Sequence, residues 1–171
     1  MNDHETPEEP TIEFRPPTYS DGTRMWEITR DSQVLDVNSS YAYVLWGRDF
    51  SASSIVATVD GRVSGFIMGY TRPDRPDTLL VWQVAVDADQ RGHGIAGRML
   101  NSLLDRLAPT GVDRLETTIS PDNEASKALF GAVARSRGMT IRSEALFAPS
   151  DFPDAHEAED LYIIERPADA Q

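Results

Sequence analysis

The stretch Leu79-Leu-Val-Trp-Gln-Val-Ala-Val-Asp87, followed directly by Ala88-Asp-Gln-Arg-Gly-His-Gly-Ile-Ala96, decides how the rest of the chain is interpreted. Residues 79–87 are mostly apolar and too few to cross a membrane, so they predict a buried β-strand. Residues 95–107 carry apolar side chains at helical spacing, which predicts a helix with one apolar face. These apolar residues are Ile95, Met99, Leu100, Leu103, Leu104 and Leu107. A strand is therefore expected to end in a glycine-rich turn that opens a helix.

The turn between this strand and this helix has the features of a phosphate-binding site. Backbone N–H groups at the start of a helix lack acceptors within the helix, and the helix dipole is positive there. Gly92 and Gly94 have no side chain to keep a phosphate away from the backbone, and Arg91 adds a guanidinium group. A solvated turn without a ligand is the alternative for a lone Gly-x-Gly.

Two other nucleotide-binding motifs were weighed against this turn. A Walker loop is excluded because no Gly-Lys-Ser/Thr follows the glycines. Gly92-x-Gly94-x-x-Gly97 satisfies the dinucleotide-binding pattern literally, but that pattern belongs after the first strand of its fold. Here the motif lies in the middle of the chain behind a hairpin, which disfavours a dinucleotide-binding site.

Composition limits the class of protein. The 171 residues predict one domain over residues 11–171, preceded by a disordered acidic tail over residues 1–10. The absence of cysteine excludes disulfides, thiolate metal sites and cysteine nucleophiles. A net charge of −12 disfavours nucleic acids and anionic membranes as partners. With no apolar run of membrane-spanning length and no signal-peptide pattern, a cytoplasmic protein is expected.

The order of the expected elements predicts an α/β fold, with a mixed central sheet and helices on both faces. Two apolar runs joined by Asp60-Gly61 form the clearest hairpin, and residues 71–77 are expected to be an exposed loop. The expected strands are residues 11–15, 54–59, 62–70, 79–87, 114–119, a short one near 140–141, and 161–164. Besides the helix over 95–107, one helix is expected from the cap Asp21 to about Arg30, and another from Pro121–Glu124 to its stop at Gly138.

The motif Gln/Arg-x-x-Gly-x-Gly/Ala after a strand ending in Val-Ala-Val resembles the acetyl-CoA signature of the GCN5-related N-acetyltransferases (GNAT). The resemblance implies the GNAT fold, in which the central strand splays from its neighbour and pairs with the pantetheine arm of acetyl-CoA. Many members carry a tyrosine acid where Phe130 stands, and phenylalanine cannot donate a proton. The implied cofactor contacts are Val84, Ala85, Val86, Arg91, Gly92, His93, Gly94, Ile95, Ala96, Asn123 and Phe130.

Four segments resemble one family within that superfamily, the L-2,4-diaminobutyrate acetyltransferases of ectoine biosynthesis. The segments are residues 35–43, 81–87, 115–126 and 151–162. The resemblance implies transfer of acetyl from acetyl-CoA to the 4-amino group of diaminobutyrate, a role in osmotic stress, and a homodimer. The chain departs from the family at Ala158, where an aspartate is usual.

Acetyl transfer to an amine requires a base, because an alkylammonium has a pKa of about 10.4 and must lose a proton before it attacks. Carboxylates and an aromatic face suit a cationic diamine. The catalytic candidates are Asp36, Glu157 and Tyr41, the last as a replacement for the missing acid. The substrate-binding candidates are Asp36, Asn38, Tyr41, Trp82, Thr118, His156, Glu157 and Glu159. Glu116 alternates with Leu115 on the expected strand, so it is expected to face the acceptor cleft and to share that face with Thr118. No metal is expected.

Three competing functions stay open at this point. An acetyltransferase of the same fold could act on another small amine, such as a polyamine or an amino acid. A noncatalytic acyl-CoA sensor is suggested by Phe130. An N-terminal acetyltransferase acting on proteins ranks lower, because the acidic residues 154–160 are expected to narrow the acceptor cleft.

Overall fold

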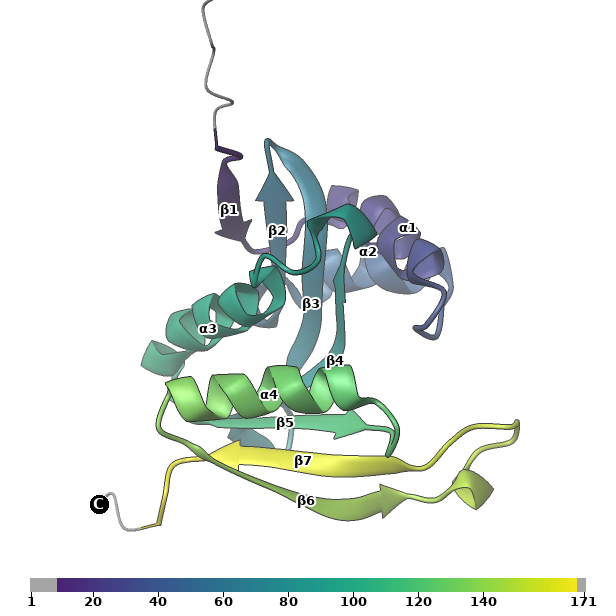
Figure 1. The fold of residues 1–171 in the computed structure, drawn as a ribbon, viewed down its shortest axis with the longest axis vertical. Helices are drawn as coiled ribbons and strands as arrows, with labels where there is room; N and C mark the ends of the chain where they lie inside the picture. Colours follow the sequence, from purple (N-terminus) through teal and green to yellow (C-terminus); the bar gives the residue numbers. More distant parts are fainter. Residues whose placement is uncertain (1–8, 169–171) are drawn as a thin grey trace, which may run out of the picture.

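The computed structural model describes residues 9–168, so most of the expected tail over residues 1–10 lies outside the described part. Seven strands form one mixed sheet in the order β1-β2-β3-β4-β5-β7-β6 (Figure 1). The strands are β1 Ile12–Arg15, β2 Ile55–Val59, β3 Arg62–Arg72, β4 Arg75–Val86, β5 Arg114–Ile119, β6 Thr140–Phe147 and β7 Glu159–Glu165. All neighbours pair antiparallel except β4 and β5, which are parallel.

Four helices cover the two faces of this sheet, which confirms the expected mixed sheet with helices on both faces. They are α1 Gly22–Ser32, α2 Ser40–Asp49, α3 Ile95–Leu107 and α4 Glu124–Ser136. One buried cluster joins α1 and α2 to the sheet through Met25, Ile28, Tyr43 and Phe66. A larger cluster joins α3 and α4 to the opposite face. The sheet therefore separates two apolar layers.

The apolar periodicity predicted α3 correctly, because all six of its apolar residues named above are buried. The hairpin is also confirmed: Asp60 and Gly61 adopt positive φ angles of 50° and 81°, as a tight two-residue turn requires. Gly138 has φ 63° just after α4 and ends that helix as expected. Among the described residues, none of the helices is long and apolar enough to span a membrane.

Three expectations about local structure were wrong. The exposed loop over residues 71–77 is instead the end of β3, a two-residue turn and the start of β4, held there by pairing of Arg72 with Arg75. The strand expected near 140–141 runs to Phe147, because it pairs with β7 along its length. Asp21 precedes α1, but its carboxylate accepts hydrogen bonds from Arg15 and Thr18 instead of capping the helix.

A β-bulge in β4 determines which side chains face α2. Met68 of β3 pairs with Gln83, whereas Gly69 pairs with Val81, so Trp82 is an extra residue in β4. The bulge interrupts the regular alternation of side chains between the two faces. Both Trp82 and its neighbour Gln83 consequently contact residues of α2.

Beyond the bulge, β4 separates from β5. Their parallel pairing covers residues 78–81 and 114–117, although β4 continues to Val86 and β5 to Ile119. Figure 1 shows the two strands running in different directions past this point. At the divergence, the Thr117 hydroxyl donates to the carbonyl of Val81 at 3.1 Å. The far edge of residues 82–86 is thus free of pairing to β5, as the GNAT resemblance implied.

The sequence predicts that Glu116 of β5 faces the acceptor cleft, but in the structure it does not face an open cleft. Its side chain is 2% exposed, and its carboxylate accepts hydrogen bonds from Arg72 and Arg114, each at 2.9 Å. Arg114 also pairs with Glu165 of β7. The ion pairs of Glu116 and Glu165 therefore tie β3, β5 and β7 together beside the part where β4 and β5 are paired.

Replacing Glu116 with glutamine is expected to lower the free energy of unfolding by about 2 kcal/mol at neutral pH, since two guanidinium groups lose their buried partner. Burial alone raises the pKa of Glu116, but Arg72 and Arg114 outweigh burial and hold the pKa below its usual value. The stabilisation is therefore present above the ordinary glutamate pKa of about 4.3 and is lost as the pH falls through the folded-state pKa.

Urea denaturation of the wild type and Glu116→Gln at neutral and acidic pH tests this expectation. The difference in unfolding free energy is expected to shrink on acidification. A difference that stays constant over this range would contradict the proposed role of the Glu116 charge.

Candidate functional site

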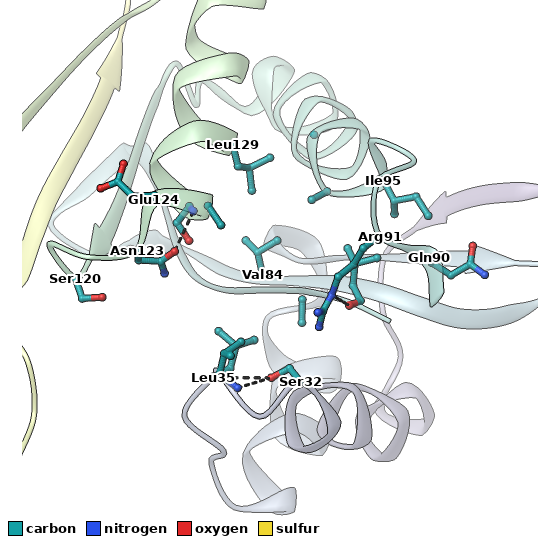
Figure 2. A pocket seen from close by; sticks show the side chains of 18 of the residues that line it. Ser32, Leu35, Val84, Gln90, Arg91, Ile95, Ser120, Asn123, Glu124 and Leu129 are labelled. Atoms are coloured by element: carbon teal, nitrogen blue, oxygen red, sulfur yellow. Dashed lines mark hydrogen bonds between the residues drawn. The ribbon is translucent and has the colours of Figure 1, made fainter. Parts of the chain in front are cut away.

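A cavity of about 1010 Å³ opens where β4 separates from β5. Figure 2 shows Gln90, Arg91 and Ile95 at one end of it and Ser120, Asn123 and Glu124 at the other. Val84 lies between the two ends. The cavity therefore runs from the glycine-rich turn, along the free edge of β4, to the start of α4.

The glycine-rich turn forms the first end of the cavity. Gly92 and Gly94 adopt φ angles of 81° and 69°, and a Cβ added at either position would meet no atom within 4 Å. Gly94 immediately precedes α3, whose first internal hydrogen bond is donated by the N–H of Arg98 to the Gly94 carbonyl at 3.0 Å. The open space in front of these glycines, together with the N-terminal N–H groups of α3, fits an anionic group.

Most of the predicted cofactor contacts line this cavity. They are Val84, Ala85, Val86, Arg91, Gly92, Gly94, Ile95, Ala96 and Asn123. The side chain of His93 is exposed outside the lining, and its Nδ1 lies 3.2 Å from the Gln90 carbonyl. Arg91 donates from Nε to the Val86 carbonyl at 3.3 Å, which holds its guanidinium beside the turn.

The residues of α4 take roles that differ from those expected. Asn123 caps α4, with its Oδ1 accepting from the Ser126 N–H at 3.0 Å, so its amide group is engaged in the helix as well as lining the cavity. Phe130 is buried in the core shared with α3 and is absent from the lining. Its expected cofactor contact is therefore not supported by its position. Leu129, its neighbour, presents its side chain to the cavity instead (Figure 2).

Two carboxyl groups meet at the second end of the cavity. Glu157, on the connection between β6 and β7, lines the cavity with Ser120 and Asp122. The neighbouring carboxyl group of Asp122 raises the pKa of Glu157, and burial adds to this, while His156 and the Ser120 hydroxyl act in the opposite direction. A carboxylate whose pKa is raised toward neutrality suits a general base.

Asp36 and His156 face each other beside this end. Asp36 Oδ2 lies 3.5 Å from His156 Nε2, and the His156 ring stacks on Phe152 with centroids 4.0 Å apart. The Glu157 carbonyl, which lies 2.8 Å from Nδ1, and the carboxylates of Asp36 and Glu159 raise the pKa of His156. The segment that follows α1 thus approaches the connection between β6 and β7.

Trp82 is 44% exposed, and its ring centroid lies 4.9 Å from that of Trp46. From the residues alone, Trp82 could equally be a plain core residue or an aromatic face over the substrate cation, and the family resemblance favours the second. The exposed bulge position favours the second reading, because a core indole would be covered.

The remaining acceptor candidates are more scattered. Tyr41 is 70% exposed and lines a separate small depression with Tyr19 and Arg48. A proton donor must reach the leaving sulfur, so the position of Tyr41 does not support it as the acid. Asn38, Thr118 and Glu159 are half-buried and lie outside the lining. Within residues 9–168, Glu157 alone of the acceptor candidates lines the cavity.

Several residues of the cavity were missed from the sequence. Ser32 lines it from the last position of α1, Val34 and Leu35 from the segment that follows, and Ser120 and Asp122 from the turn after β5. Asp122 lies inside the segment over residues 115–126 that resembles the family. Nothing in the sequence placed it beside Glu157, which is 35 positions away. Among the described residues, no group of three or more His, Asp or Glu side chains is arranged to hold a metal ion.

The sequence and the fold were compared with known proteins. Residues 18–133 match the sequence profile of the Acetyltransferase (GNAT) family. An L-2,4-diaminobutyric acid acetyltransferase from Nocardia farcinica is 54% identical over 90% of this chain and 80% of its own length. A protein of the same name from Marinococcus halophilus is 42% identical over 88% of this chain and 87% of its own length.

Solved structures show the same relationship. Diaminobutyrate acetyltransferase EctA from Paenibacillus lautus, in complex with L-2,4-diaminobutyric acid and coenzyme A, is 40% identical with a TM-score of 0.87 and covers 92% of this chain and 96% of its own. Ard1 from Thermoplasma volcanium shares the fold, with a TM-score of 0.73 and 19% sequence identity. The match covers 91% of this chain and 99% of the Ard1 chain. The chain belongs to the acetyltransferase (GNAT) family, among relatives named L-2,4-diaminobutyric acid acetyltransferase.

Proposed function

We propose that this protein transfers acetyl from acetyl-CoA to the 4-amino group of L-2,4-diaminobutyrate. The observation that carries the proposal is the cavity itself, which joins an anion-binding turn to a pair of carboxyl groups along the free edge of β4. The relatives that support it are named for diaminobutyrate, and one of them binds both diaminobutyric acid and coenzyme A. The product, N4-acetyl-L-2,4-diaminobutyrate, would serve ectoine biosynthesis and osmotic protection.

The residues present fit acetyl-CoA. The pyrophosphate is assigned to the turn of Gly92 and Gly94, where the N–H groups of α3 and the Arg91 guanidinium supply positive charge. The pantetheine amides are assigned to the unpaired edge of residues 84–86, because an exposed strand edge offers backbone donors and acceptors. The thioester would then lie near Ser120 and Glu157, at the far end of the cavity.

The acceptor is assigned to the side where Asp36, Trp82 and His156 lie. Carboxylates and an exposed indole face both attract an ammonium group. Glu157, with its pKa raised by Asp122, would remove a proton from the 4-ammonium directly or through a water molecule. Asn38, Thr118 and Glu159 remain proposed substrate contacts, whereas Tyr41, which lines a separate depression, is given no role.

The freed amine then attacks the thioester carbonyl. A new C–N bond forms, and the carbonyl electrons move to oxygen. Their return breaks the C–S bond to release coenzyme A thiolate, and the second proton of the attacking nitrogen passes to that thiolate or to water, which leaves a neutral amide. A thiol has a pKa of about 8.5, so the sulfur can leave as a thiolate without a dedicated acid. The N-terminus of α4 opens on this end of the cavity and favours negative charge there. This route accounts for Phe130 in place of a tyrosine.

Thiol release from acetyl-CoA, measured with L-2,4-diaminobutyrate, ornithine, lysine and spermidine side by side, tests the proposal. We expect a clear preference for diaminobutyrate. Preference for another amine would keep acetyl transfer but overturn the substrate. Binding of coenzyme A without turnover on any amine would favour the acyl-CoA sensor.

We also propose that the protein is a homodimer that works in the cytoplasm, where acetyl-CoA is made. The edge strand β6 is exposed along its whole length and presents Ile141, Leu146 and Phe147. Arg142 and Glu144 flank its midpoint, so antiparallel pairing with a second copy would place each arginine opposite a glutamate.

Phe147→Lys is expected to convert a dimer to a monomer, because it puts a charge among the apolar residues of this strand. Light scattering would measure the mass, and Ala108→Lys, at an exposed position directly after α3, is a suitable charge control. A wild-type protein that is monomeric at micromolar concentration would refute the dimer, and cell fractionation tests the location.

A further inference from the structure

The segment over residues 33–39, which joins α1 to α2, carries Asp36 and is largely exposed, although Leu35 packs against the buried cluster of α1 and α2. Val34 is strongly exposed, and the Asp36 side chain is 91% exposed. At its start, the Ser32 hydroxyl accepts hydrogen bonds from the N–H groups of Val34 and Leu35 at 3.4 and 3.3 Å. These bonds fix the beginning of the segment but not the position of Asp36, which needs another anchor.

Gln83 provides that anchor from β4. Its amide Nε2 donates to the backbone carbonyl of Asp36 at 3.0 Å, and its Oε1 accepts from the Tyr43 hydroxyl at 3.0 Å. A carbonyl can only accept, so the bond to Asp36 fixes the orientation of the amide. Gln83 is 8% exposed and Tyr43 is fully buried, so water cannot easily replace the bond between them, whereas the bond to the Asp36 carbonyl is half-buried.

The bulge in β4 makes this anchor possible. Because Trp82 is an extra residue, both Trp82 and Gln83 contact α2: the first through Trp46 and the second through Tyr43. The aromatic face assigned to the acceptor and the anchor of Asp36 are therefore consecutive residues of one strand. Any movement of the 33–39 segment would change the distance between the Asp36 carboxylate and this face.

We propose that Gln83 is a positioning residue for the diamino acid, which it serves by clamping the backbone of Asp36 to β4. The identity of the substrate in this inference rests on the proposed function, whereas the hydrogen bond from Gln83 to the Asp36 backbone does not depend on it. Gln83 acts through Asp36, whose carboxylate lies 3.5 Å from His156 across the acceptor side of the cavity. Loss of the clamp should weaken acceptor binding more than binding of acetyl-CoA, most of whose assigned contacts lie on β4, α3 and α4.

Gln83→Met tests the proposal, because methionine has a similar length but forms neither hydrogen bond. Tyr43→Phe removes the donor to Gln83 while keeping the ring in the core. Thr117→Val is the matched control, since it also removes a buried hydrogen bond to a backbone carbonyl but does not touch the 33–39 segment. KM for each substrate, kcat, and amide hydrogen exchange over residues 33–39 would be measured for all three variants.

We expect Gln83→Met to raise KM for diaminobutyrate roughly tenfold, as loss of about 1.4 kcal/mol of binding would. KM for acetyl-CoA should change much less, and amide exchange over 33–39 should accelerate. Tyr43→Phe should do the same to a smaller extent, and Thr117→Val should do neither. Unchanged exchange in Gln83→Met, or an equal rise in both KM values, would overturn the positioning role. If the wild type did not turn over diaminobutyrate, the proposed function would fail, while the exchange comparison would still decide whether the clamp exists.

Discussion

Gly94→Val is expected to lower kcat/KM for acetyl-CoA about 100-fold, which corresponds to ~2.8 kcal/mol. Gly94 has φ 69° at the start of α3, and its missing Cβ leaves open the space assigned to the pyrophosphate. A β-branched side chain disfavours this backbone conformation and would enter that space. The turn would have to change its backbone conformation, and the N–H groups at the start of α3 would no longer point at the phosphate.

Gly138→Val separates backbone strain from loss of the phosphate site. Gly138 has a similar φ of 63°, its Cβ would also meet nothing within 4 Å, and it lies past the far end of α4, outside the cavity lining. Both variants should lose similar unfolding free energy in urea. Only Gly94→Val should lose coenzyme A binding in calorimetry, and equal binding by both variants would argue against the assigned phosphate site.

Glu157→Gln is expected to lower kcat by about 100-fold to 10,000-fold, the range for loss of a general base, with little change in KM for acetyl-CoA. The amide cannot take a proton from the ammonium at neutral pH. Asp154→Asn, on the same connection but outside the cavity lining, is the control and should retain most of the activity. A Glu157→Gln enzyme with wild-type kcat would remove Glu157 from the reaction.

The pH profile tests the partner of Glu157. The base works when deprotonated, so the rate should fall as the pH drops through its pKa. Asp122 raises that pKa, so Asp122→Asn should lower it and move the acidic limb of the kcat profile to lower pH. An acidic limb that stays in place would show that the pair does not control the titration.

Much of the cofactor site could be predicted from the sequence, because it is local. The turn at Gly92 and Gly94 and the apolar face of α3 are set by consecutive residues, and each residue type has one dominant physical reason to be there. The order of elements then placed the turn at the end of a central strand. The separation of β4 from β5 could be predicted only from the family resemblance, because no pattern of residues indicates where the pairing of two strands ends.

The acceptor side could not be predicted in the same way, because it is assembled from distant segments. Glu157 meets Asp122, and Asp36 meets His156, through the packing of the β6–β7 connection against segments far away in sequence. The bulge at Trp82 requires only one extra residue, and the position of such a residue cannot be recognised within an apolar run of the sequence. Glu116 shows the opposite error: its alternation on β5 suggested an open cleft, but Arg72 and Arg114 bury it.

The position of the new acetyl group is the most direct test of the account. Purified protein would be incubated with acetyl-CoA and L-2,4-diaminobutyrate, and two-dimensional NMR would identify the acetylated nitrogen. We predict a single product with acetyl on the 4-nitrogen. Acetylation of the 2-nitrogen, or no acetylated diaminobutyrate while another amine is acetylated, would contradict the proposed function.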